Sequence, residues 1–312
     1  MKDKLNIIFM GSGLYGSLVL NSLDQSNFNI SCIFTKSNKV ISRNLKKERF
    51  FDLESDNIPI RQISKFSEQD LDIIIKSETD LIIVASFGLI LPDSMLSIPN
   101  FGVINIHPSL LPKYRGPSPI SSCIVSGEKI TGVTIMKMVK ELDAGPILHQ
   151  EKFELDANLT SDEVGTKLFE IGTNKINELF SKIAIPEIIE LEQDHSKATF
   201  TRIVKKIDGQ INWKEDIQVI FRKFKAYYSW PGIYTYWNNK RIIFKEFTIE
   251  AENDFNNVAG KILELKNDKL IVSAQGGKIC VSDIQMEGGK SMRSSVFVNG
   301  RPEIIGDFFK QN

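Results

Sequence analysis

The sequence is poor in cysteine and contains no long apolar run. Its three cysteines, Cys32, Cys123 and Cys280, lie far apart and form no CxxC pair, which argues against a disulfide scaffold or a zinc ribbon and favours a reducing compartment. The apolar stretch in residues 5–10 is too short to span a membrane, and no small-residue cleavage site follows it. We therefore expect a cytoplasmic protein that has no membrane partner.

An excess of charge of either sign is also absent. The 39 lysines and arginines balance 39 aspartates and glutamates, so the formal net charge at pH 7 is zero. Bulk charge therefore cannot attract a nucleic acid, although a local basic patch still could. Hydrophobic residues make up 42% of the chain and charged residues 25%, which is globular composition and excludes wholesale disorder. The length of 312 residues favours two domains.

The first half of the chain alternates short apolar runs with segments of helical periodicity. Strand-length runs rich in β-branched residues occupy residues 5–10, 30–35, 81–86 and 103–106, and helical spacing appears in residues 17–23 and 68–76 and beyond a capping signal at residue 160. Fully apolar strands separated by helices are typical of a sheet that is covered on both faces. The pattern predicts an α/β fold, a Rossmann-like open and mainly parallel sheet with helices on both faces, in residues 1–186.

The second half has a different pattern. Residues 187–207 are polar and irregular, and we interpret them as a linker. A helix is expected at 217–228, and short strands are expected at 233–237, 241–249, 260–265, 269–273 and 278–284, separated by turns rich in Asn, Asp and Gly. This spacing predicts a small β-barrel of the OB-like type in residues 208–312.

A literal GxGxxG motif, made by Gly11, Gly13 and Gly16, follows the first predicted strand. This context is typical of dinucleotide binding, because the glycines let a pyrophosphate approach a helix N-terminus. The acidic residue that would hold the ribose is missing after the second strand, where Lys36 could instead favour a 2′-phosphate. A tight strand-to-helix turn is the simpler interpretation, and we expect no nicotinamide cofactor.

The residues best suited to chemistry are Asn105, His107 and Asp143. Asn105 and His107 are two apart at the end of a predicted strand, so both side chains point to one face, and Pro108 ends the strand there. Asp143 lies in a glycine turn between two strands predicted at residues 133–138 and 147–155, from which it can reach the imidazole. This set suits attack of an amine on a carbonyl: the amide donates to the oxyanion, the imidazole moves a proton, and the carboxylate orients the imidazole. The other histidines have no companions at metal-ligand spacing, so we expect no metal.

Several motifs around these residues resemble one enzyme family. Asn105-x-His107, Ser109-Leu-Leu-Pro112 and Leu142-Asp-x-Gly145 resemble the signature of the 10-formyltetrahydrofolate-dependent formyltransferases. The similarity extends over nearly the whole chain to the members that formylate methionyl-tRNA, through Phe87-Gly-Leu-Ile-Leu-Pro92, Tyr114-Arg-Gly116, Thr131-Gly-Val-Thr-Ile-Met136, Trp230-Pro-Gly232, Gly289-Lys-Ser-Met292 and Phe297-Val-Asn-Gly300.

The resemblance implies a reaction and a site. Asn105, His107 and Asp143 would be the catalytic residues, and the folate would lie against Ser109, Leu110, Leu111 and Pro112. The α-amine of charged initiator methionyl-tRNA would attack the formyl group on N10 of 10-formyltetrahydrofolate, giving formylmethionyl-tRNA for translation initiation. The folate would be a consumed co-substrate, with no metal involved.

The resemblance also implies contacts with the tRNA. Arg43, Lys46 and Lys47 lie in a basic loop where the family inserts into the acceptor stem, although Asn44 and Leu45 depart from the family's Arg-Gly-x-Lys pattern. Lys205 and Lys206 belong to a basic segment that could follow an RNA backbone. Tyr15 stands where the family places an aromatic residue near the methionyl side chain, and core packing is its competing interpretation. We expect a monomer.

Two other classes of function stay open at this point. One is a different formyltransferase on the same catalytic fold, acting on a sugar-nucleotide amine or on glycinamide ribonucleotide, although the latter enzyme normally lacks a C-terminal domain. The other is an NADP-binding or RNA-binding protein with no formyltransferase activity, in which the three polar residues would coincide by chance.

Overall fold

The computed structural model describes residues 4–37, 58–180, 188–251 and 258–310, which divide into two compact units. The first unit comprises Met1–Pro119, Ile130–Leu155 and Glu163–Arg202, and the second comprises Ile120–Lys129, Asp156–Asp162 and Ile203–Asn312. Residues 188–202 thus group with the first unit. Among the described residues, no helix has both the length and the apolar character that crossing a membrane requires.

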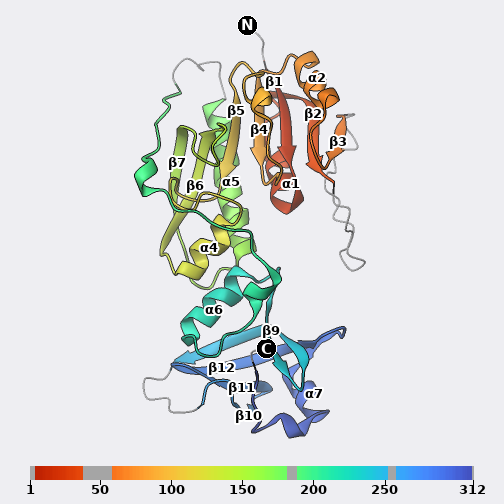
Figure 1. The fold of residues 1–312 in the computed structure, drawn as a ribbon, viewed down its shortest axis with the longest axis vertical. Coiled ribbons are helices and arrows are strands. Elements are labelled where there is room, and N and C mark those ends of the chain that lie inside the picture. The colour runs from red at the N-terminus through yellow and green to blue at the C-terminus, as the bar shows by residue number, and fades with distance from the viewer. Residues whose placement is uncertain (1–3, 38–57, 181–187, 252–257, 311–312) are drawn as a thin grey trace. The chain divides into compact units, whose positions relative to one another are not determined.

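The first unit is built on a seven-stranded sheet with the order β3-β2-β1-β4-β5-β6-β7 (Figure 1). The strands from β3 to β5 pair in parallel, whereas β6 is antiparallel to both β5 and β7. This arrangement confirms the predicted open, mainly parallel sheet. Their bounds are β1 (Leu5–Gly11), β2 (Phe28–Lys36), β3 (Ile60–Ile63), β4 (Leu81–Ala85), β5 (Val103–His107), β6 (Ile130–Lys137) and β7 (Ile147–Glu154).

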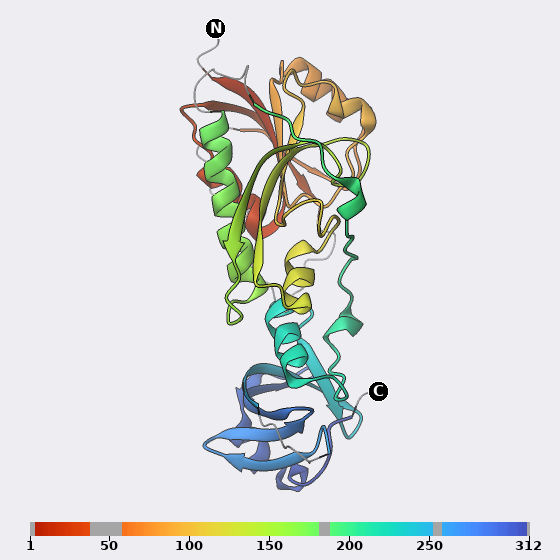
Figure 2. The same cartoon turned by 90° about the vertical axis from the view of Figure 1, so that its left-hand side faces the viewer.

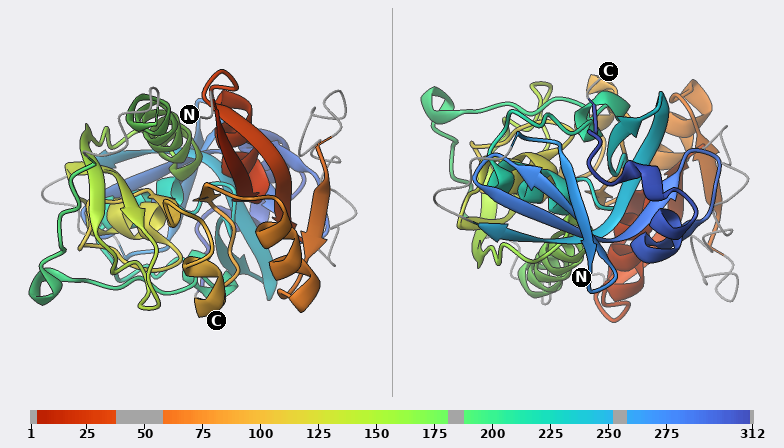
Figure 3. Two further views of the ribbon diagram at one scale, coloured as in Figure 1. Left: turned by 90° about the horizontal axis from the view of Figure 1, so that it is seen from above. Right: turned by 90° about the horizontal axis from the view of Figure 1, so that it is seen from below.

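Helices cover both faces of this sheet. Helices α1 (Gly13–Ser22) and α5 (Ser161–Leu179) lie on one face, and α2 (Glu68–Lys76) lies on the other, as Figure 2 and the left view of Figure 3 show. The short α3 (Asp93–Leu96) follows β4. Helix α2 has the predicted bounds because Ser67 and Asp70 form a capping box at its start.

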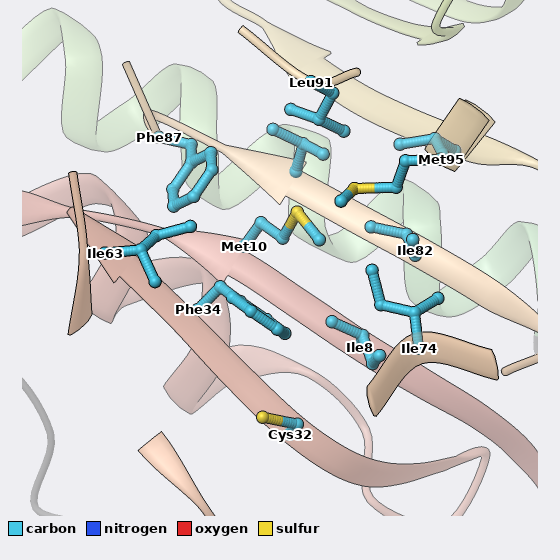
Figure 4. Packing of buried hydrophobic residues seen from close by; sticks show 12 residues of the cluster. Ile8, Met10, Cys32, Phe34, Ile63, Ile74, Ile82, Phe87, Leu91 and Met95 are labelled. Atoms are coloured by element: carbon cyan, nitrogen blue, oxygen red, sulfur yellow. The ribbon is translucent and has the colours of Figure 1, made fainter. Parts of the chain in front are cut away.

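Alternate residues of the central strands form the core beneath α2. Ile8 and Met10 of β1 and Phe34 of β2 pack with Ile74 of α2 and Met95 of α3 (Figure 4). All five side chains are fully buried. Because successive strand residues point to opposite faces, the intervening residues of the same strands line the face beneath α1 and α5.

Two glycines allow α5 to approach the opposite face closely. A Cβ atom on Gly165 would lie 2.2 Å from the hydroxyl oxygen of Tyr15, whose ring stacks on Phe169 with centroids 4.8 Å apart. A Cβ atom on Gly172 would lie 2.7 Å from Cγ2 of Ile106. Ile106 therefore points toward α5, and its neighbours in β5, Asn105 among them, point to the other face.

The glycines of the GxGxxG motif serve the same close packing. A Cβ atom on Gly16 would lie 2.9 Å from the backbone carbon of Gly11, so α1 can start close to the end of β1 only with glycine at this position. Gly13 has a φ of +70°, a conformation that favours glycine. The structure thus gives the motif a packing role in the turn.

The second unit contains a six-stranded antiparallel sheet with the order β10-β11-β12-β9-β8, in which β13 also pairs with β12. The C-terminal segment bridges its two edges, because Lys310 pairs with Tyr236 of β8 and Phe308 pairs with Lys261 beside β10. The sheet therefore closes on itself, in agreement with the predicted small barrel. The strands are β8 (Ile233–Trp237), β9 (Lys240–Ala251), β10 (Ile262–Lys266), β11 (Lys269–Ala274), β12 (Gly277–Met286) and β13 (Ser291–Arg293).

Two helices pack on this sheet, and a segment distant in sequence contacts one of them. Helix α6 (Ile217–Ala226) lies on β9 and β12, and α7 (Ser294–Asn299) packs on β11 and β12 (Figure 3, right). Helix α4 (Pro119–Ser126) joins α6 through a hydrogen bond from Ser121 Oγ to the Ala226 carbonyl at 3.1 Å. The described residues also contain three single-turn helices: η3 (His195–Lys197) in the first unit, and η4 (Lys206–Gly209) and η5 (Pro302–Ile304) in the second.

None of the three cysteines forms a disulfide within the described residues, and the side chains of all three are buried. Burial raises the pKa of Cys32, and burial together with the nearby Glu250 carboxylate raises the pKa of Cys280 to about 11. The thiols of Cys32 and Cys280 therefore stay protonated at neutral pH and act as small apolar core groups.

The close approach of α5 gives a stability prediction. Gly165→Ala should lower the free energy of unfolding by about 1–2 kcal/mol, since overpacking against Tyr15 outweighs the better helix propensity of alanine. Urea unfolding followed by circular dichroism measures the change. Gly300→Ala is the control, because its nearest neighbouring atoms would lie 3.8 Å away. In a Tyr15→Ala background the same Gly165→Ala change should be neutral or stabilising, and an equal loss in both backgrounds would contradict the assigned contact.

Candidate active site

His107 ends β5 on the sheet face opposite to α5, and its residue is only 4% exposed. Its Nε2 atom lies 3.0 Å from the carbonyl oxygen of Tyr114. Because a carbonyl only accepts, Nε2 must carry the hydrogen. The other ring nitrogen, Nδ1, lies 3.7 Å from Oδ2 of Asp143. The local geometry thus leaves Nδ1 as the atom that can take up a proton.

Asp143 occupies the turn between β6 and β7, as the sequence predicts, with a φ of +49°. Its Oδ2 atom accepts a hydrogen bond of 2.7 Å from the backbone N–H of Gly116. The same oxygen faces His107, so the carboxylate joins the Asp143 turn, the Gly116 loop and the end of β5. The structure therefore brings Asp143 and His107 together, although they are far apart in sequence.

The surroundings of His107 oppose its protonation. Burial lowers the pKa of the imidazole below its ordinary value of 6.5, and the charge of Arg115 lowers it further. The Asp143 carboxylate and the hydrogen bond to Tyr114 act in the opposite direction but do not overcome burial. At neutral pH the ring is therefore uncharged, with a free electron pair on Nδ1 beside a carboxylate that stabilises the charged form.

Asn105 lies two residues before His107 on the same face of β5, opposite Val84 of β4 and Met136 of β6. Its residue is half-buried, and its side-chain amide forms no hydrogen bond within the described residues. The amide N–H groups are therefore available to an oxygen atom of a substrate beside the imidazole.

The loop after β5 is held by buried hydrogen bonds. Thr134 Oγ1 donates to the Ser109 carbonyl at 2.6 Å and accepts from the Leu111 backbone N–H at 3.2 Å. Gln150 Nε2 donates to the Leu111 carbonyl at 2.9 Å. Ser109 and Leu111 are buried and shape the loop, whereas Leu110 and Pro112 are half-buried. Of these four residues, Leu110 and Pro112 are thus the ones at the loop surface that can make the folate contacts implied by the resemblance.

The structure adds residues to which the sequence assigned no role. Tyr114 and Gly116 supply backbone groups to His107 and Asp143, and Arg115 and Gln193 form a buried hydrogen-bonded pair beside them. The Tyr114-Arg-Gly116 stretch is visible as part of the family pattern, but backbone contacts leave no signal in side-chain type. Gln193 has no sequence signal, because it lies in a polar segment that reads as a linker.

The remaining predicted contacts lie elsewhere. Tyr15 packs on Phe169 of α5, on the sheet face opposite to Asn105. Lys205 and Lys206 are exposed in the second unit. Arg43, Lys46 and Lys47 lie outside the described residues.

Within the described ranges, no group of three or more His, Cys, Asp or Glu side chains is placed to hold a metal ion. The Nδ1 atom of His195 lies 3.0 Å from a guanidinium nitrogen of Arg115, and Nε2 of His149 lies 3.7 Å from Glu151.

The open sheet and this site define a class of protein, an α/β enzyme whose neutral imidazole, carboxylate and free amide suit acyl transfer to an amine. The chain matches the family described as "Formyl transferase" over residues 4–179 and "Formyl transferase, C-terminal domain" over residues 203–302. The chain therefore belongs to the formyl transferase family.

Curated relatives match the chain over almost its whole length. A methionyl-tRNA formyltransferase of Caldicellulosiruptor saccharolyticus is 34% identical over 310 residues, which cover 97% of this chain and 99% of the relative. A methionyl-tRNA formyltransferase of Thermotoga maritima is also 34% identical, over 311 residues covering 98% and 99%.

Solved structures share the fold at lower identity. HypX from Aquifex aeolicus in complex with tetrahydrofolic acid matches with a TM-score of 0.65 and 14% identity, covering 100% of this chain and 51% of that protein. Methionyl-tRNA formyltransferase from Clostridium thermocellum matches with a TM-score of 0.56 and 18% identity, covering 87% and 98%.

The site geometry predicts how His107 titrates. Its pKa should lie below 6.5 in the native protein, and Asp143→Asn should lower it further, because the substitution removes the charge that favours the imidazolium. NMR titration of the ring signals measures this value, and the presence of only three histidines allows assignment with His149→Gln and His195→Gln. Circular dichroism of the variant is the folding control. A rise in the His107 pKa on Asp143→Asn would contradict the assigned pairing.

Proposed function

We propose that this chain transfers the formyl group of 10-formyltetrahydrofolate to the α-amine of methionyl-initiator-tRNA, the reaction used to start translation with formylmethionine. The observation that carries the proposal is the match to methionyl-tRNA formyltransferases through both units, with 97% of the chain and 99% of the relative covered. A sugar-nucleotide amine as acceptor is less well supported, because the curated relatives matching over the full length are named for the tRNA reaction.

The described residues support each step of this reaction. The neutral amine attacks the formyl carbon, which forms the new C–N bond, and the amide N–H of Asn105 donates to the oxyanion that develops. The C–N10 bond then breaks and tetrahydrofolate leaves. The amine loses one proton and N10 gains one. A single group that accepts the proton from the amine and delivers it to N10 is therefore sufficient. Nδ1 of His107 takes this role, and the Asp143 carboxylate 3.7 Å away stabilises the imidazolium.

The folate is a co-substrate, consumed in each cycle. The surface of the loop after β5, with Leu110 and Pro112, supplies apolar contact near Asn105 and His107. We further propose that the enzyme acts in the cytoplasm, where charged tRNA and reduced folate occur together, and that it works as a monomer.

The catalytic assignment predicts the effect of two truncations. His107→Ala should lower turnover by about 10²–10⁴, and Asn105→Ala by about 10²–10³, with the fold kept. The assay follows formylation of methionyl-tRNA by 10-formyltetrahydrofolate, with an amino sugar nucleotide as the alternative acceptor and circular dichroism as the folding control. Wild-type turnover by either folded variant would refute its assignment, and transfer to the amino sugar alone would refute the tRNA proposal.

A neutral chain must hold a polyanion through local patches. We propose two patches, the loop containing Arg43 and the exposed pair Lys205 and Lys206. Contacts between cations and phosphates release counterions, which makes the affinity fall with salt. Folate binding against a partly apolar loop should depend much less on salt.

Charge reversal tests these patches. Lys205→Glu and Lys206→Glu should weaken tRNA binding and flatten its salt dependence, and Arg43→Glu should raise the Michaelis constant for tRNA or slow turnover. A salt series of tRNA affinity measures the binding and its salt dependence, and steady-state kinetics measures the Michaelis constant and turnover. Folate affinity is expected to stay constant. Lys76→Glu, an exposed reversal at the end of α2, is the matched control. Unchanged affinity and slope in all three variants would exclude the two-patch proposal.

A further inference from the structure

Gln193 connects two parts of the site from within the first unit. Its residue is 4% exposed, as is Arg115. The side-chain NH₂ group of Gln193 donates to the carbonyl of Asp143 at 2.9 Å and to the carbonyl of Gly145 at 2.7 Å. The amide oxygen of the same side chain accepts from Arg115, at 2.6 Å from Nη2 and 3.2 Å from Nε. Every polar atom of the Gln193 side chain is therefore engaged.

The backbone of the turn that Gln193 contacts is constrained at Asp143 and Gly145. Asp143 has a φ of +49°, which is unfavourable for a residue with a side chain. Gly145 admits no Cβ, because that atom would lie 2.0 Å from the carbonyl oxygen of Lys137. The carbonyl oxygens of Asp143 and Gly145 can only accept hydrogen bonds. The side-chain amide of Gln193 donates to both of them and so fixes the backbone of the turn.

The opposite side of the contact is fixed as well. The Arg115 backbone N–H donates to the Thr199 carbonyl at 2.8 Å, and its carbonyl accepts from the Thr201 N–H at 2.7 Å. Gly116, the next residue, donates to the Asp143 carboxylate. The loop containing Arg115 and the turn containing Asp143 are thus joined twice, once through the Gly116 N–H and once through Gln193.

We propose that Gln193 is a positioning residue for the formyl transfer, holding the Asp143 turn against the Arg115 loop so that the carboxylate stays beside Nδ1 of His107. Gln193 touches neither the imidazole nor a reacting atom. It acts through Asp143, whose main chain it holds while Gly116 holds the side chain. The kinetic part of this inference rests on the proposed function.

The competing interpretation is structural, since Gln193 also satisfies the buried guanidinium of Arg115. Two substitutions separate the roles. Gln193→Glu keeps an acceptor for Arg115 but replaces the donors to the two carbonyls with oxygen atoms that repel them. Gln193→Met keeps the length of the side chain and removes both functions. If Gln193 only satisfies Arg115, the glutamate variant should be as active as the wild type.

The experiment measures turnover and the titration of His107. We expect both variants to lower kcat by at least about tenfold, because small displacements of catalytic groups are costly, while the Michaelis constants change less than about threefold. In Gln193→Met the His107 pKa should fall below the wild-type value, since the Asp143 carboxylate moves away while the Arg115 charge remains. Gln285→Met is the matched control: this glutamine also donates to a carbonyl, that of Gly289, but in the second unit.

The outcomes are distinct. Wild-type kcat in folded Gln193→Glu, or an unchanged His107 pKa in folded Gln193→Met, would overturn the proposal. If the methionine variant does not fold, the kcat of the glutamate variant still decides. The NMR titration needs no acceptor, so it tests the positioning role even if methionyl-tRNA proves not to be the substrate.

Discussion

The burial of one neutral imidazole is the constraint on which the site depends. His107 is almost without solvent, so both ring nitrogens must face protein groups, which come from Tyr114 and Asp143. Those two residues lie on separate loops, and the loops must meet for the ring to be accommodated. The hydrogen bond from the Gly116 N–H to the Asp143 carboxylate joins the two loops, and the geometry of the site results from it.

The segment before the second unit shows why composition alone misleads. Its polar residues were interpreted as a linker, but residues 193–201 supply hydrogen-bond partners to the loop at residues 114–118. Thr199 Oγ1 accepts from the Tyr114 N–H at 2.8 Å, and Thr201 Oγ1 accepts from the Ser118 N–H at 3.1 Å. A polar segment can thus form part of a site, because the backbone N–H and carbonyl groups of a buried loop need hydrogen-bond partners.

Periodicity predicted the large elements well, and local chemistry explains where it succeeded. Helix α2 was predicted to the residue from the helical spacing of its apolar residues, and the structure adds a capping box at its start. The sheet followed from uninterrupted apolar runs. The strand β3 (Ile60–Ile63) and helix α3 are too short to show a period. His107 and Asp143 could be paired in advance from their residue types and turn, whereas Gln193 could not, because its partners are backbone atoms.

The burial of every cysteine has a practical consequence for labelling this protein with a fluorophore. Thiols enclosed in the core are shielded from maleimides while the protein is folded, so the native cysteines should not be labelled by such reagents. Ile207 is exposed beside Lys205 and Lys206, so Ile207→Cys would place an accessible thiol next to this proposed patch. A fluorophore attached there would report binding of the proposed RNA substrate in real time, and no native cysteine would have to be removed.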